Sequence, residues 1–95
     1  MIRNVTLIKW KPGTSREQVQ AVTEAMKRLR IEGMRELTMG DDARLRDGNM
    51  DSAVVADFDS VEAYRAYDSD AEHNRIRREL VAPIVDRIER CQVVL

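Results

Sequence analysis

Two side chains in the stretch AYDSDAEHNRI (66–76) could transfer protons: Tyr67 and His73, which is the only histidine of the chain. A neutral histidine, with an ordinary pKa of about 6.5, can accept a proton at cellular pH. A tyrosine hydroxyl can donate to an oxygen that gains charge. The pair is therefore a candidate for general acid–base catalysis. The alternative is a helix boundary, where His73 bonds the neighbouring backbone and Tyr67 packs its ring.

The composition predicts a single small domain over residues 1–95. The 16 basic and 17 acidic residues give a net charge of −1, which argues against nucleic-acid binding. The lone Cys91 can form no internal disulfide and no metal cluster, which favours a cytoplasmic protein without a metal site. The apolar N-terminal stretch 1–10 is too short to cross a membrane, so no membrane association is expected. The motifs of phosphate and dinucleotide sites are absent, so no cofactor is expected.

Hydrophobic periodicity predicts the elements that must position Tyr67 and His73. Ser15 with Gln18 indicates a capping box at the start of the first helix, with Thr14 and Glu17 as an alternative register. Asp59 with Glu62 indicates another at a short second helix. A third helix is predicted from His73, with Pro83 inside it as a kink. The expected elements are a strand at 2–10, a helix at 16–31, strands at 34–40 and 50–58, a short helix reaching Tyr67, a helix from His73 that includes Ile84 and Ile88, and a closing strand at 91–95.

The element order β-α-β-β-α-β predicts an α+β, ferredoxin-like fold, with a four-stranded antiparallel sheet and the helices on one face. The strand at 2–10 carries apolar residues on both faces, with Ile8 and Trp10 on one face and Val5 and Leu7 on the other. A face left without helices would expose an apolar patch, so a homodimer packed through this uncovered sheet face is expected. The alternative is a monomer in which a few apolar side chains meet water.

Three stretches of the chain resemble the Dabb family, the stress-responsive dimeric α/β-barrel proteins. They are IRNVTLIKWKPGTS (2–15), DSAVVADFDSVEAYRAYDSDAEH (51–73) and the helix with Pro83 that follows His73. The resemblance implies a ferredoxin-like subunit and a homodimer whose two sheets form a barrel. Many members of the family have no assigned reaction.

The resemblance also implies a site. The family includes a plant polyketide cyclase that closes a ring by aldol condensation, and its tyrosine and histidine match Tyr67 and His73. A second family histidine commonly lies in the first strand, where this chain has Asn4. An amide orients a substrate oxygen but cannot shuttle a proton. Four residues on one face of that strand are predicted to floor the site and bind substrate: Asn4, Thr6, Ile8 and Trp10.

Two functions follow from this pattern. The first is a cofactor-free, cyclase- or lyase-like enzyme with His73 as the base and Tyr67 as the donor. The second is a non-catalytic dimer that is stress-responsive or binds a small ligand. The basic cluster Arg75, Arg77 and Arg78 is expected to be a solvated face, with an anion site at the cavity mouth as the alternative. A relation to antibiotic-biosynthesis monooxygenases, which share the dimeric barrel, is a third possibility carried by fold alone.

Overall fold

The structure is a computed structural model that describes residues 1–95, and its elements follow the predicted order with one extra helix. Three helices follow one another directly between the third and fourth strands. The elements are β1 (Ile2–Trp10), α1 (Arg16–Lys27), β2 (Met34–Asp41), β3 (Ser52–Phe58), α2 (Val61–Ser69), α3 (Ala71–Ile76), the π-helix η1 (Arg77–Val81) and β4 (Val85–Val94).

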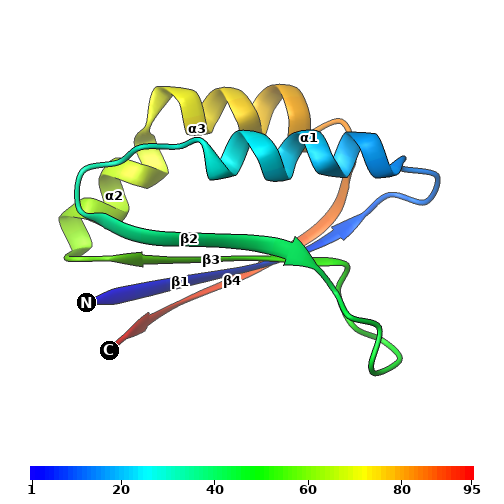
Figure 1. Cartoon of the computed structure of the whole chain (residues 1–95), viewed down its shortest axis with the longest axis horizontal. Coiled ribbons are helices and arrows are strands. Elements are labelled where there is room, and N and C mark those ends of the chain that lie inside the picture. Colours follow the sequence, from blue (N-terminus) through cyan, green and yellow to red (C-terminus); the bar gives the residue numbers. More distant parts are fainter.

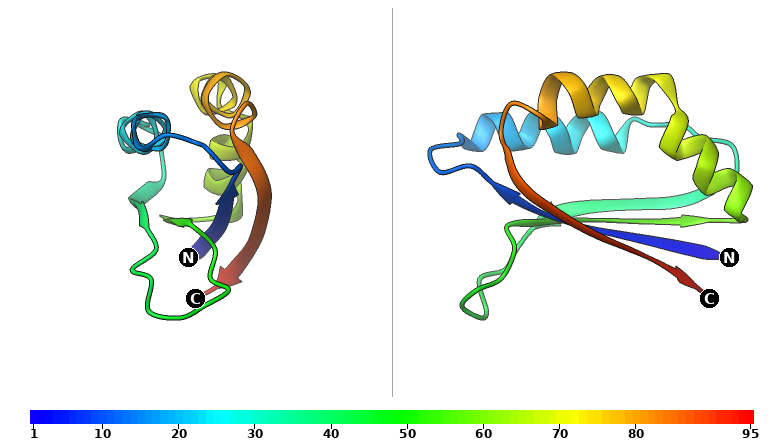
Figure 2. Two further views of the ribbon diagram at one scale, coloured as in Figure 1. Left: turned by 90° about the vertical axis from the view of Figure 1, so that its right-hand side faces the viewer. Right: turned by 180° about the vertical axis from the view of Figure 1, so that it is seen from behind.

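The four strands form one antiparallel sheet in the order β2-β3-β1-β4. All the helices lie on one face of this sheet, and the other face has no covering element (Figures 1 and 2). This is the ferredoxin-like arrangement predicted from the sequence. No helix is both long and apolar enough to span a membrane.

β1 lies in the middle of the sheet and presents its two sets of side chains to different surroundings. Ile2, Ile8 and Trp10 on the helix side are buried in the core. Leu7, on the other side, is 38% exposed. Successive strand residues point to opposite faces, so the register of β1 fixes which side chains face the helices.

The capping box predicted at α1 is present. Ser15 Oγ accepts a hydrogen bond from the Gln18 amide at 3.1 Å, and Gln18 Oε1 accepts one from the Ser15 amide at 2.8 Å. The helix ends at Lys27, four residues before the predicted end at 31. Its last turn is closed by Arg30, whose Nη1 donates to the Lys27 and Leu29 carbonyls. Leu29 then turns into the core, where it is buried.

The helix cap predicted at Asp59 is one residue out of place. Ser60 caps α2 instead, because its hydroxyl accepts a hydrogen bond from the Ala63 amide at 3.1 Å. Asp59 forms an ion pair with Arg35 on β2. Asp59 and Ser60 are both good N-cap residues. The ion pair with Arg35, which occupies Asp59 and leaves Ser60 as the cap, is not visible in the sequence.

The prediction of a long last helix is wrong beyond Val81. The helix ends in the π-turn of η1, Pro83 lies in the following turn, and β4 begins at Val85 rather than near 91. Ala82 still has helical backbone angles, but Pro83 has no amide hydrogen to continue the helical hydrogen bonds, so the helix ends here rather than kinking. Ile88 therefore lies on a strand, paired with Ile8 of β1. Its spacing from Ile84 fits both a helical and a strand period.

The approach of α2 to the turn before β2 leaves no room for a side chain at Gly33. This glycine has φ +84°, and a Cβ placed on it would lie 2.6 Å from Ala63 Cβ. Gly13 has the same φ of +84°, with no atom within 4 Å of the same position. We therefore expect Gly13→Ala to lower the free energy of unfolding by about 1 kcal/mol through backbone strain. Gly33→Ala should cost a further 1 to 3 kcal/mol, roughly, through overpacking.

Denaturant unfolding at equal protein concentrations would measure both losses. Because φ is the same at the two glycines, the difference between the variants isolates the clash with Ala63. Equal losses would contradict the close packing of α2 on the 31–34 turn.

Candidate functional site

The break between α2 and α3 brings Tyr67 and His73 together. Asp70 ends α2 and caps α3, with its carboxylate accepting from the His73 amide at 2.9 Å. The chain turns at this cap, so the two rings stack with their centroids 4.1 Å apart and their planes tilted by 34°. Each residue is only 3% exposed. The helix boundary and the side-chain pair are therefore one feature of the fold.

A backbone hydrogen bond sets the tautomer of His73. Its Nδ1 lies 2.8 Å from the carbonyl oxygen of Tyr67. Because a carbonyl oxygen can only accept, Nδ1 must carry the hydrogen. In the neutral ring Nε2 then holds the lone pair, which is the form that a general base requires.

Burial keeps both side chains uncharged at neutral pH. It lowers the pKa of His73 below its ordinary value and outweighs the opposing hydrogen bond to the Tyr67 carbonyl. Burial also raises the pKa of Tyr67 to about 12, with Arg77 acting in the opposite direction. The site thus holds a neutral imidazole beside a neutral phenol.

The two reactive atoms have no partner within the protein. The hydrogen bonds of the structure include none to the Tyr67 hydroxyl or to His73 Nε2. Neither atom is among the fully buried unsatisfied polar atoms, of which there are none. Both residues are among those that line the adjoining cavity.

That cavity lies between the helices and the middle of β1, and its volume is about 60 Å³. This space suits a few water molecules or a small polar group, and it is well below the roughly 300 Å³ of a drug-sized site. Three of the four predicted floor residues line it, namely Asn4, Thr6 and Ile8. The other lining residues are Val22, Met26, Val54, Tyr64, Tyr67, His73, Arg77, Val81, Ile88 and Arg90.

A row of amides and a hydroxyl orients Asn4. Gln92 Nε2 of β4 donates to Asn4 Oδ1 at 2.7 Å, and Asn4 Nδ2 donates to Thr6 Oγ1 at 3.3 Å. Asn4 therefore has its oxygen occupied, and one amide hydrogen is left over. The Thr6 hydroxyl hydrogen is also unused and can turn toward the cavity.

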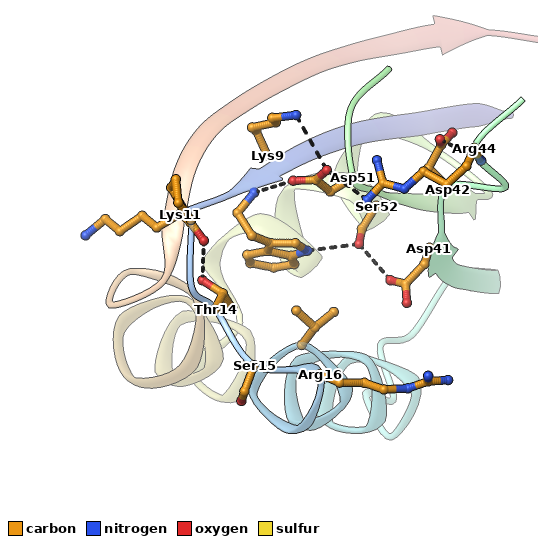
Figure 3. A pocket seen from close by; sticks show the side chains of 13 residues that line it. Lys9, Lys11, Thr14, Ser15, Arg16, Asp41, Asp42, Arg44, Asp51 and Ser52 are labelled. Carbon is orange, nitrogen blue, oxygen red and sulfur yellow. Dashed lines mark hydrogen bonds and ion pairs between the residues drawn. The ribbon is translucent and has the colours of Figure 1, made fainter. Parts of the chain in front are cut away.

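Trp10 does not join this cavity. It lies beyond the floor residues along β1, where its indole Nε1 donates to Ser52 Oγ at 3.0 Å. This end of β1 lines a second, wider pocket of about 630 Å³ between the start of α1 and the β2–β3 loop (Figure 3). The helix-side face of β1 therefore lines both the Tyr67–His73 cavity and this second pocket.

Asp51 organises the second pocket. It accepts from the Trp10 amide at 2.9 Å, and it pairs with Lys9 at 3.6 Å and with Arg44 at 3.2 Å (Figure 3). These contacts lower the pKa of Asp51, with the Trp10 amide as the largest cause. Ser52, in turn, donates to Asp41 at 2.9 Å. The polar groups around Asp51 satisfy one another, which identifies a structural network that fixes the β2–β3 loop to β1.

The arginines of the basic cluster predicted on the last helix do not all have the same surroundings. Arg75 pairs with Glu72 and Glu79 on the helix surface, as expected for a solvated face. Arg77 instead lines the cavity, and its guanidinium pairs with Asp68 at 2.8 Å. The π-turn that begins at Arg77 changes the helical spacing here, and such turns are frequent at functional sites.

Sequence reasoning missed two other residues beside the site, Gln92 and Arg90. Both lie on the edge strand β4, which the sequence predicted to be much shorter. Thr6 pairs with Arg90 and Asn4 with Gln92, so alternation along a correctly placed β4 would have found them. No group of three or more His, Cys, Asp or Glu side chains is arranged to hold a metal ion.

A family model matches nearly the whole chain. The model is Dabb, the stress responsive A/B barrel domain, and it covers residues 2–93. The chain belongs to the Dabb family. Comparison with curated protein sequences found no match.

Solved structures share the fold of this Dabb protein. A dimeric ferredoxin-like protein of unknown function from Thermobifida fusca is 31% identical, with a TM-score of 0.91 over 99% of this chain and 90% of that one. The Arabidopsis thaliana protein At3g17210 is 21% identical, with a TM-score of 0.83 over 100% and 95% of the two chains. The hydroxynitrile lyase of Passiflora edulis is 17% identical, with a TM-score of 0.84 over 99% and 92%. The last two likenesses show the fold alone.

The environment of His73 predicts its titration. We expect the folded protein to titrate below the ordinary pKa of 6.5 and to carry its neutral hydrogen on Nδ1. The unfolded chain then binds more protons near that pH than the folded one. Stability should therefore fall as the pH drops from about 7 through the folded pKa.

Long-range ¹H–¹⁵N spectra of the ring would measure both properties, and the single histidine makes the signal unambiguous. The chain unfolded in denaturant supplies the reference pKa. A folded pKa at or above that reference, or a hydrogen on Nε2, would contradict the assignment.

Proposed function

We propose that this Dabb protein is a cofactor-free enzyme that transfers protons on small carbonyl compounds, as an aldol-type cyclase or lyase. The observation that carries the proposal is the pair of unpartnered atoms, His73 Nε2 and the Tyr67 hydroxyl, at one small cavity. Two neutral groups of complementary role at one cavity are what such chemistry requires.

The reaction would begin with His73. Nε2 takes a proton from the carbon beside a carbonyl, and the electrons of that C–H bond form the carbon–carbon double bond of an enolate. The Tyr67 hydroxyl donates a hydrogen bond to the enolate oxygen. The enolate carbon then attacks a second carbonyl carbon of the same molecule, and the new alkoxide takes the proton back from the imidazolium. The reverse sequence cleaves the bond, which is the lyase direction.

The floor of the cavity would position the substrate. The remaining amide hydrogen of Asn4 and the hydroxyl hydrogen of Thr6 can bind a substrate oxygen, and Ile8 supplies an apolar wall. Asn4 takes no proton in this scheme, so His73 both removes and returns it. In the Passiflora edulis protein the same fold belongs to a hydroxynitrile lyase, which supports the lyase direction at the level of fold.

The second candidate is a non-catalytic dimer, either stress-responsive or binding a small ligand. The small volume of the cavity, about 60 Å³, favours it, because a complete cyclase substrate would need more space than the single chain offers. Catalysis therefore requires that the substrate be small or that only its reacting end enter the cavity.

The uncovered face of the sheet supports a homodimer. Val55, Val5 and Cys91 lie side by side in an apolar strip across this face, with Leu7 next to Val5 along β1 and Val93 next to Cys91 along β4. Cys91 is exposed in the single chain, because it lies on the uncovered side of the edge strand. The β2–β3 loop extends past the sheet on the same side (Figures 1 and 2), and its Leu45 is 85% exposed. The Thermobifida fusca structure is described as dimeric.

Hydrogen–deuterium exchange tests the proposed chemistry without knowledge of the natural substrate. In D₂O the protein should accelerate exchange of the protons beside the ketone of methyl levulinate, followed by ¹H NMR. His73→Gln should reduce this acceleration about 100-fold or more, because the base is lost. Tyr67→Phe should reduce it about 100-fold through loss of one donor to the developing oxyanion.

The matched control is Ser69→Ala, which removes an exposed hydroxyl from α2 outside the cavity lining. It should keep the wild-type rate. Unchanged exchange in a folded His73→Gln variant would refute the role of His73, and no acceleration by the wild type would favour the non-catalytic candidate.

Sedimentation and light scattering test the dimer. Val5→Glu places a charge in the centre of the apolar strip and should convert the dimer to a folded monomer, because an unpaired buried charge is costly. Val61→Glu introduces the same charge at an exposed valine on the helix side and should leave the dimer intact. A monomeric wild type would refute the proposed dimer, and a Val5→Glu variant that remains dimeric would place the interface elsewhere.

A further inference from the structure

Arg90 is a guanidinium without a partner at the mouth of the Tyr67–His73 cavity. It pairs with Thr6 in the register of β4 and β1, so its side chain lies on the same face of the sheet as Thr6, and it lines the cavity. β4 is an edge strand, which leaves Arg90 exposed to solvent. The ion pairs and side-chain hydrogen bonds of the structure include none from Arg90.

The other cation at the cavity, Arg77, is already satisfied. It donates to the Asp68 carboxylate and the Asp68 carbonyl oxygen, both at 2.8 Å, and to Asn74 Oδ1 at 3.0 Å. The charged groups that act on the Tyr67 hydroxyl are Arg77, Asp68 and Arg90. Since Arg77 and Asp68 neutralise each other, Arg90 leaves the mouth with a net positive charge.

The size of the cavity determines where a charged substrate group could lie. With about 60 Å³ the cavity admits the reacting end of a small molecule. An anion inside it would lose its hydration and meet only the neutral donors of Asn4, Thr6 and Tyr67, with no unpaired cation, which is costly. An anionic group of the substrate would therefore stay at the mouth, where Arg90 is free to bind it.

We infer that Arg90 selects substrates that carry a carboxylate, namely short oxo acids whose carbonyl reaches Tyr67 and His73. The planar guanidinium can bind a carboxylate through two parallel hydrogen bonds, which fixes the orientation of the acid as well as attracting it. This inference rests on the proposed function, because it assumes that a carbonyl compound occupies the cavity. It adds the substrate class and a specificity-determining residue.

The test compares levulinate and pyruvate with their methyl esters, which keep the ketone and remove the charge. Binding is followed by NMR titration of the His73 ring, and the variants are Arg90→Gln and Arg90→Lys. We expect each acid to bind the wild type about tenfold more tightly than its ester. Arg90→Gln should abolish this preference without weakening the ester, and Arg90→Lys should restore part of it.

The matched control is Arg65→Gln, which removes an exposed arginine from α2 outside the cavity lining and should keep the preference. If the wild type binds neither acid, binds acid and ester equally, or keeps its preference in Arg90→Gln, the inference is overturned. Exchange of methyl levulinate reports on His73 independently, because the ester has no charge for Arg90 to bind. Exchange without a preference for acids would therefore overturn the role of Arg90 alone.

Discussion

The hydrogen bond from His73 Nδ1 to the Tyr67 carbonyl is the interaction on which the site depends. It joins the end of α2 to the start of α3, and Asp70 supports it by capping α3 at the amide of the same histidine. The bond leaves the lone pair on Nε2, and the burial of the ring at this junction lowers its pKa. This backbone contact therefore determines the position and the tautomer of the candidate base, while burial keeps the ring neutral.

One face of the sheet forms the floor of the cavity beside Tyr67 and His73, and the opposite face forms the proposed dimer interface. The alternation of β1 places Asn4 and Thr6 under the rings while Val5 and Leu7 face away from the helices. A shift of one residue in register would exchange the two sets, so the cavity and the proposed dimer interface are fixed by the same pairing. A substitution that shifts the register of β1 would therefore change both the cavity and the proposed interface.

The way the last helix ends completes the site. The π-turn at Arg77 and the proline that follows bring the chain back early enough for β4 to run the full length of β1. The edge strand then carries Gln92 beside Asn4 and Arg90 beside Thr6. Polar groups from an edge strand lie at the rim of a cavity rather than inside it, which is why Arg90 remains free to meet solvent or a ligand.

The sequence alone determined the element order, the two-faced first strand, the capping box at Ser15 and the Tyr67–His73 pair, because these depend on local spacing and periodicity. It failed where two local patterns competed. Ile88 fitted both a helix and a strand, and only the pairing of β4 with β1 decided for the strand. Only the tertiary structure placed Trp10 outside the cavity and left Arg90 without an ion-pair partner at its mouth, since both outcomes depend on contacts between segments distant in the chain.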